Sequence, residues 1–243
     1  MVPVRAQEGF EELVGTKVTL AVADGTNMGA FVACPVATPR PLPGLIVLQE
    51  AFGVNKNTRE IAERLSAEGF LCIAPELFHR TAPGKEFPYD FEAVKPHYMA
   101  ITTPGLEADL RAAFLWLQNE GVKSIGAIGF CLGGRAAYVA NAILPLKAAV
   151  SFYGGGIAGE LLERAKDQRG PILFFWGGKD AHITPEVRKP LFEALGAAEK
   201  PYVNVEFSAA NHAFFNNDRP SYEPASAAQA FALAKAFLKS NLA

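Results

Sequence analysis

The chain has only three cysteines among its 243 residues, and this scarcity limits the kind of protein it can be. A small, odd number of cysteines does not predict a disulfide framework and favours a reducing compartment such as the cytoplasm. The spacing of cysteine and histidine does not resemble a zinc or iron–sulfur site. We therefore expect neither a metal nor another cofactor.

Long hydrophobic runs and basic runs are also missing. Apolar segments such as Gly44–Leu48 and Pro171–Trp176 have the length of strands and are too short to cross a membrane. The first ten residues lack the continuous apolar stretch of a secretory signal. With scattered lysines and arginines and a formal net charge of -2, the chain has no electrostatic feature that predicts binding to nucleic acid or an anionic membrane. We predict a cytoplasmic protein, a monomer or small homo-oligomer, that acts on a small molecule.

The chain does contain an alternation of strand-like and helix-like segments, and its length fits one α/β domain over residues 1–243. A turn signal at Asp24–Asn27 predicts an N-terminal hairpin. The predicted strands are Lys17–Ala23, Gly29–Pro35, Leu45–Gln49, Leu71–Ala74, Ser124–Ile128, Ala148–Phe152, Ile172–Trp176 and Val203–Phe207. The proline-rich segment Ala37–Pro43 is expected to be a surface connection.

Helical patterns separate most of these strands. The helices are expected from Asn57 as N-cap to about Glu68, over Leu106–Gly121, after Cys131, from Thr184 and Pro185 onward, and over Ala225–Leu242. This order predicts a mostly parallel eight-stranded sheet with helices on both faces.

One turn stands out as a candidate catalytic element. Gly129–Gly134 reads Gly-Phe-Cys-Leu-Gly-Gly and follows a buried strand, with a helix expected directly after it. This is the pattern of a nucleophile elbow, G-x-S-x-G, with Cys131 in the serine position. The small residues let strand and helix converge, and the helix N-terminus points free N–H groups at a developing oxyanion. The alternative is a buried cysteine in a glycine-rich crossover.

Candidate partners of Cys131 follow two later strands. Asp180 comes after Ile172–Trp176 and His212 after Val203–Phe207, and polar residues at these strand ends meet at the ligand-binding edge of such sheets. The order nucleophile, acid, histidine is that of the α/β-hydrolase triad. The histidine would transfer the proton, and the aspartate would orient the imidazole.

Two further charged residues follow strands. Glu50 is costly to bury without a partner, so we expect it either to pair with a basic residue or to hold or accept the proton of the cysteine. Arg80 is either a clamp for a substrate carboxylate or a surface charge. Phe52 and Tyr153 are candidate walls of the substrate pocket. The other histidines, His79, His97 and His182, are expected to be structural or solvated.

Five segments, spread over nearly the whole chain, resemble the dienelactone hydrolase family. They are Gln49–Gly53, Glu76–Gly84, Gly129–Gly134, Gly177–Asp180 and Asn211–Phe214. In that order they are similar to Q-E-x-F-G, D-L-Y-x-R, G-[FY]-C-x-G-G, G-x-x-D and H-[AGS]-F. The resemblance implies an α/β-hydrolase fold and hydrolysis of an enol-lactone or a related ester.

The resemblance also implies residue roles. It makes Cys131 the nucleophile, with His212 and Asp180 as triad partners, and lets Glu50 interact with the resting thiol and help to generate the thiolate. The oxyanion hole would be the backbone N–H groups of Leu132 and Ala51.

The chain departs from the family pattern at one substrate-binding position. Members that act on dienelactone hold its carboxylate with two arginines. Arg80 fits the first, but Asn216 stands at the second, four residues after His212. A neutral amide cannot offer a charged fork, so the natural substrate could be a different ester or lactone.

Three other functions are compatible with parts of the pattern. A class I glutamine amidotransferase also carries cysteine on an elbow, but His212-Ala213-Phe214 lacks its H-x-E sequence. A non-catalytic binding protein on the same scaffold usually lacks a triad member, and here all three are present. The third is a general small-molecule carboxylesterase without lactone preference.

Overall fold

The computed structural model describes residues 15–35 and 41–243. The first ten residues, considered above for a secretory signal, lie outside the described residues, as does most of the predicted connection Ala37–Pro43.

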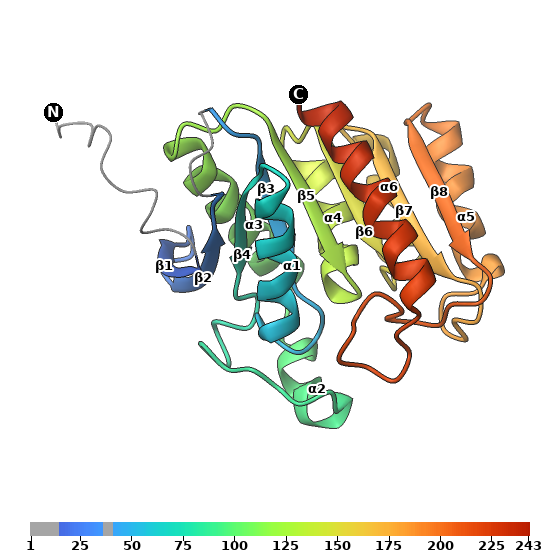
Figure 1. Ribbon diagram of the computed structural model, residues 1–243, viewed down its shortest axis with the longest axis horizontal. Helices are drawn as coiled ribbons and strands as arrows, with labels where there is room; N and C mark the ends of the chain where they lie inside the picture. The colour runs from blue at the N-terminus through green and yellow to red at the C-terminus, as the bar shows by residue number, and fades with distance from the viewer. Residues whose placement is uncertain (1–14, 36–40) are drawn as a thin grey trace, which may run out of the picture.

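The described strands form an eight-stranded sheet in the order β1-β2-β4-β3-β5-β6-β7-β8 (Figure 1). Their bounds are β1 Thr16–Ala21, β2 Asn27–Ala33, β3 Gly44–Leu48, β4 Leu71–Pro75, β5 Ile125–Phe130, β6 Ala148–Phe152, β7 Ile172–Gly177 and β8 Tyr202–Phe207. β1 and β2 form the predicted antiparallel hairpin, and β2 is also antiparallel to β4. All other neighbours are parallel. The predicted mostly parallel sheet is confirmed.

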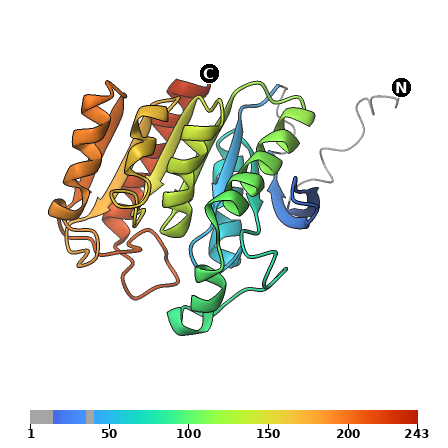
Figure 2. The same cartoon turned by 180° about the vertical axis from the view of Figure 1, so that it is seen from behind.

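Helices cover both faces of the sheet. They are α1 Lys56–Ala67, α2 Phe91–Met99, α3 Thr103–Asn119, α4 Leu132–Ile143, α5 Pro185–Ala197 and α6 Pro224–Leu242, with a 3-10 helix, η2, over Leu162–Asp167. α1 and α6 pack on one face, and α3, α4 and α5 on the other (Figures 1 and 2). The central strands β3, β5, β6 and β7 are therefore buried along their whole length, as their unbroken apolar sequences require.

One helix prediction needs correction, and one helix was not predicted. The N-cap of α1 is Asn55, whose side chain accepts a hydrogen bond from the N–H of Thr58 at 3.2 Å, whereas Asn57 lies inside the first turn. α2 was not predicted, because it contains Pro96 and Val94 is its only buried residue, so it shows little helical periodicity. Figure 1 shows α2 beyond the end of the sheet toward which β5 points.

The elbow between β5 and α4 explains the glycines around Cys131. A Cβ on Gly129 would collide with the backbone carbonyl of Gly133, and a Cβ on Gly133 would collide with that of Leu48. The missing side chains let α4 begin one residue after Cys131, directly against β5 and β3. Cys131 itself has φ 53°, an unusual value for a residue with a side chain.

We expect the substitution Gly129→Ala to destabilise the fold strongly, because the new methyl group has only backbone to displace. The loss in unfolding free energy should exceed about 2 kcal/mol, the upper part of the usual range for one substitution. A suitable control is Gly196→Ala in α5, where an added Cβ meets nothing within 4 Å. That control should be neutral or stabilising by about 0.4–1 kcal/mol. Urea unfolding of the two variants measures the contrast, and equal effects would contradict it.

Candidate active site

Cys131 lies at the carboxyl end of β5, at the edge of the sheet where ligands bind in parallel α/β folds. Its N–H donates a hydrogen bond to the carbonyl of Phe152 at 3.0 Å, which ties the turn to β6. The side chain is half-buried, whereas Cys34 and Cys72 are buried in the core. Among the three thiols, only Cys131 therefore lines a cavity that a small molecule can enter.

The structure brings Asp180 and His212 together beside Cys131. Asp180 Oδ2 lies 2.7 Å from His212 Nδ1. The other carboxylate oxygen accepts the backbone N–H groups of His182 and Ile183 at 2.9 and 3.1 Å. These two hydrogen bonds fix the carboxylate of Asp180, which is almost fully buried. The backbone therefore sets the orientation of this carboxylate toward the imidazole.

The charges of this trio favour a protonated histidine. Burial by itself lowers the pKa of His212, but hydrogen bonds and charge from Asp180 and Cys131 outweigh it and raise the pKa to about 10. Burial raises the pKa of Asp180, yet the hydrogen bonds from His212 and from the backbone bring it below its ordinary value. The buried carboxylate of Asp180 therefore stabilises the imidazolium form of His212.

A cavity of about 550 Å³ opens above Cys131. Its walls are mostly apolar and come from six parts of the chain: the segments after β3, β6 and β8, helix α2, the start of α4, and the segment before α5 with its first turn. The lining includes Ala51, Phe52, Phe91, Tyr98, Leu132, Ile183 and Val187. His182, which the sequence suggested was structural or solvated, is exposed at this cavity, and its N–H binds Asp180. The α2 residues were missed because the helix itself was not predicted.

Glu50 lies buried beneath the cavity in a hydrogen-bonded cluster. The hydroxyl of Tyr153 donates to Glu50 Oε1 at 3.1 Å, and Asn216 Nδ2 donates to Oε2 at 2.9 Å. Burial raises the pKa of Glu50, while these two donors and the charge of Arg219 oppose the rise. Tyr153 and Asn216, predicted to touch substrate, do not line the cavity and bind Glu50 instead. Within the described part of the chain, no hydrogen bond joins Glu50 to Cys131.

Arg80 is not brought to this cavity. Its guanidinium makes two hydrogen bonds to the buried carboxylate of Asp109, at 2.8 and 2.9 Å, and its Nε donates to Asp24 at 2.8 Å. With its charge compensated by two carboxylates, Arg80 ties the segment after β4 to α3 and to the N-terminal hairpin. The interpretation of Arg80 as a substrate clamp therefore needs correction.

A different arginine lines the cavity. Arg219 lies with its guanidinium carbon 5.4 Å from the centre of the Phe52 ring and 5.8 Å from that of Tyr89. In the described residues no carboxylate is within ion-pair distance of it. The sequence already places Arg219 in the loop that contains His212. Arg219 was not predicted as a substrate-binding residue, because the family pattern concerns only the position of Asn216 in that loop.

The elbow, the Asp180–His212 pair and the sheet define an enzyme of the α/β-hydrolase fold. Comparison with known proteins gives its family: the dienelactone hydrolase family matches residues 28–242. The chain belongs to this family, and it is a hydrolase that acts on esters or lactones. The predicted fold and family are confirmed.

Individual relatives agree with this assignment. The chain is 37% identical over 216 residues to a candidate carboxymethylenebutenolidase of Escherichia coli, covering 84% of this chain and 79% of that protein. It is 30% identical over 220 residues to the carboxymethylenebutenolidase of Pseudomonas putida, covering 88% and 91%. A crystal structure of a candidate dienelactone hydrolase from Klebsiella pneumoniae superposes with a TM-score of 0.82 at 32% identity, covering 92% of this chain and 98% of that one.

Over residues 15–35 and 41–243, no helix has both the length and the hydrophobicity needed to cross a membrane.

We expect Asp180→Asn to reduce kcat for a small ester by up to about 10⁴-fold without unfolding the protein, because the imidazole loses the group that orients it. The same change should lower the pKa of His212 from about 10, because a neutral amide no longer stabilises the imidazolium. Steady-state kinetics and NMR titration of the imidazole measure the two effects. A kcat within about tenfold of wild type would show that another group orients His212.

Proposed function

We propose that this hydrolase uses Cys131 as its nucleophile and proceeds through an acyl-enzyme intermediate. The main support is the strained elbow: Cys131, at φ 53°, presents its thiol to a cavity beside the 2.7 Å contact of His212 with Asp180. The pKa of His212, raised to about 10, agrees with an imidazolium that can give its proton to a leaving group.

In the first half-reaction, the thiolate of Cys131 attacks the carbonyl carbon of the ester and forms a C–S bond. The carbonyl oxygen gains the negative charge. When the tetrahedral intermediate collapses, the ester C–O bond breaks and His212 gives its proton to the departing oxygen. In a lactone that oxygen stays attached to the acyl group through the opened ring.

In the second half-reaction, water attacks the thioester while His212 takes one of its protons. The C–S bond then breaks, and the acid leaves. The thiolate returns with the imidazolium beside it, so the net change is one ester plus one water to one acid plus one alcohol. Throughout, Asp180 keeps the imidazole in the orientation that both transfers need.

The oxyanion would be stabilised by the backbone N–H groups of Leu132 and Ala51. Leu132 is the first residue of α4, so its N–H has no carbonyl partner within the helix. Ala51 lies across the cavity, in the segment that follows β3. Backbone donors from the start of a helix and from a buried turn are well suited to a charge that develops only in the transition state.

Glu50 is proposed to act as a positioning group rather than as a partner of the resting thiol. Its carboxyl is held by Tyr153 and Asn216, and the Tyr153 ring lies 5.0 Å from that of His212. Through this ring, Glu50 supports the wall against which the imidazole packs.

The preferred substrate is a small ester or lactone that carries a carboxylate. A volume of about 550 Å³ is within the usual range for small-molecule sites. The walls are apolar, and Arg219 offers a positive charge with no carboxylate of the described chain within ion-pair distance. A carboxymethylenebutenolidase of Pseudomonas putida among the relatives fits such a substrate. General carboxylesterase activity is the second candidate, favoured by the apolar walls.

We expect Cys131→Ala to abolish ester hydrolysis, because no other thiol of the chain lines the cavity. The matched control is Cys34→Ala, which removes a buried thiol remote from the reaction and should keep the wild-type kcat. Initial rates with a p-nitrophenyl ester measure both. Turnover that survives in the Cys131 variant would overturn the assignment.

We expect Arg219→Ala to raise KM for a carboxylate-bearing ester by roughly 10- to 100-fold, the value of one charge-assisted contact. The KM for a neutral ester of equal size should stay nearly unchanged. Arg80→Ala provides the comparison: it should lower the melting temperature, because Asp109 loses its arginine partner and keeps only His79, and leave the ratio of the two KM values intact. Equal losses on both esters in the Arg219 variant would favour a general carboxylesterase.

The domain extent, cytoplasmic location, oligomeric state and lack of cofactor remain predictions from the sequence.

A further inference from the structure

A second cleft lies at the opposite end of the sheet from Cys131. Its volume is about 850 Å³, and it is formed where the chain enters β6, β7 and β8. Lys147 precedes β6, Arg169 lies in the connection to β7, and Lys200 lies just before β8. It shares no lining residue with the cavity above Cys131. A ligand bound there would therefore occupy a separate site.

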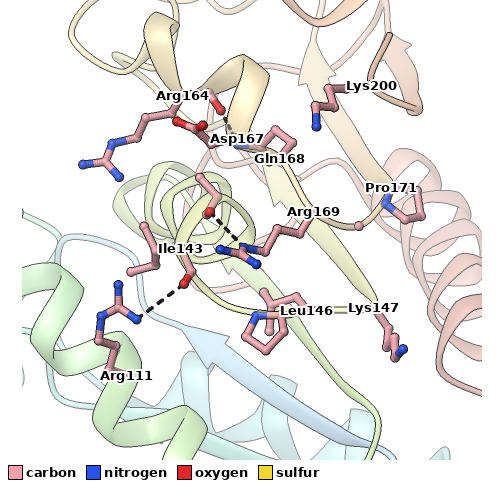
Figure 3. Close-up of a pocket in the computed structure, with 13 residues that line it drawn as sticks. Arg111, Ile143, Leu146, Lys147, Arg164, Asp167, Gln168, Arg169, Pro171 and Lys200 are labelled. Carbon is pink, nitrogen blue, oxygen red and sulfur yellow. Dashed lines mark hydrogen bonds between the residues drawn. The ribbon is translucent and has the colours of Figure 1, made fainter. Parts of the chain in front are cut away.

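The cleft concentrates positive charge in a chain whose net charge is -2. Five basic side chains line it, against one acidic side chain, Asp167. The basic residues are Arg111, Lys147, Arg164, Arg169 and Lys200. They come from α3, η2 and three separate connections, so the fold, rather than a run in the sequence, gathers them (Figure 3).

Most of these charges have no acidic partner. Arg164 is paired with Glu107, at 2.5 Å. For the other four basic residues, the described chain offers no carboxylate within ion-pair distance. Two of them also have a structural contact, because Arg111 donates to the carbonyl of Ile143 at 3.5 Å and Arg169 to that of Ala142 at 3.3 Å (Figure 3). These bonds satisfy the C-terminal end of α4 and use one N–H of each guanidinium, which carries five.

We propose that this cleft binds a small anion that carries a chain of phosphates. A single phosphate would leave most of the volume and most of the cations unused. A chain of phosphates spreads its charge over several oxygens, which guanidinium forks and lysine ammonium groups bind from different directions. Free oligophosphate and the triphosphate of a nucleotide share this chemistry. For the rest of a nucleotide, Pro145 and Pro171 offer apolar surface.

Calorimetric titration of the whole protein with sodium tripolyphosphate at low salt tests the proposal. Lys200→Ala and Arg169→Ala should each weaken binding by about tenfold or more. Asp167→Asn should strengthen binding, because it removes the only acidic group of the lining. Lys123→Ala, which removes an exposed lysine outside the cleft, should leave the affinity unchanged. Every variant should keep wild-type ester hydrolysis, which shows that it is folded.

Parallel titrations identify the ligand. ATP binding more tightly than tripolyphosphate would assign the cleft to nucleotides, and equal affinity would assign it to the phosphate chain; both results support the proposal. It would be overturned if tripolyphosphate does not bind at millimolar concentration, or binds equally well to the Lys200 and Arg169 variants. Adenosine binding as well as ATP would also overturn it. A single-stranded oligonucleotide that binds more tightly than either phosphate would replace it with a nucleic-acid surface.

Discussion

At the elbow, the backbone of Cys131 is held at φ 53° and α4 starts at the next residue, so helix and strand meet at backbone distance. This close contact depends on Gly129 and Gly133, because a methyl group on either would collide with a carbonyl. The same contact directs the first N–H groups of α4 and the thiol toward one point above the sheet. The ends of β7 and β8 then bring Asp180 and His212 to that point. The position of the Cys131 thiol above the sheet therefore depends on the close packing of α4 against β5.

The distribution of charge then decides what the site can hold. Arg80 follows a strand in the segment where the family has a substrate arginine, yet Asp109 and Asp24 compensate its charge and make it a structural residue. Arg219 comes from the loop after β8 and lies beside Phe52 and Tyr89, with no carboxylate of the described residues within ion-pair distance. Asn216, at the position of the second family arginine, binds Glu50 instead. The proposed preference for a substrate with a carboxylate rests on the position of Arg219 at this apolar cavity.

The sequence was sufficient for the strands and for the convergence of Cys131, Asp180 and His212 at one end of the sheet, because both depend on local patterns. Buried parallel strands are continuous apolar runs, and catalytic residues follow them directly. The sequence was not sufficient to predict α2, because a helix with one buried residue shows no helical periodicity of apolar residues. It was also not sufficient to predict the partners of charged side chains. Whether Arg80 faces Asp109 or a substrate depends on where α3 crosses β4, and no local pattern encodes that. Arg219 was missed for the same reason: its place at the cavity is set by how the loop after His212 folds back.

We propose that the acyl group passes through the sulfur of Cys131, and intact-protein mass spectrometry tests this step directly. A slowly hydrolysed ester mixed with the enzyme and quenched in acid should add the mass of one acyl group, mapped by peptide digestion to the peptide that contains Cys131. The adduct should decay at the rate of product release, because the thioester is an intermediate rather than a side product. Turnover with no adduct on that peptide, or an adduct that outlasts many turnovers, would contradict the account.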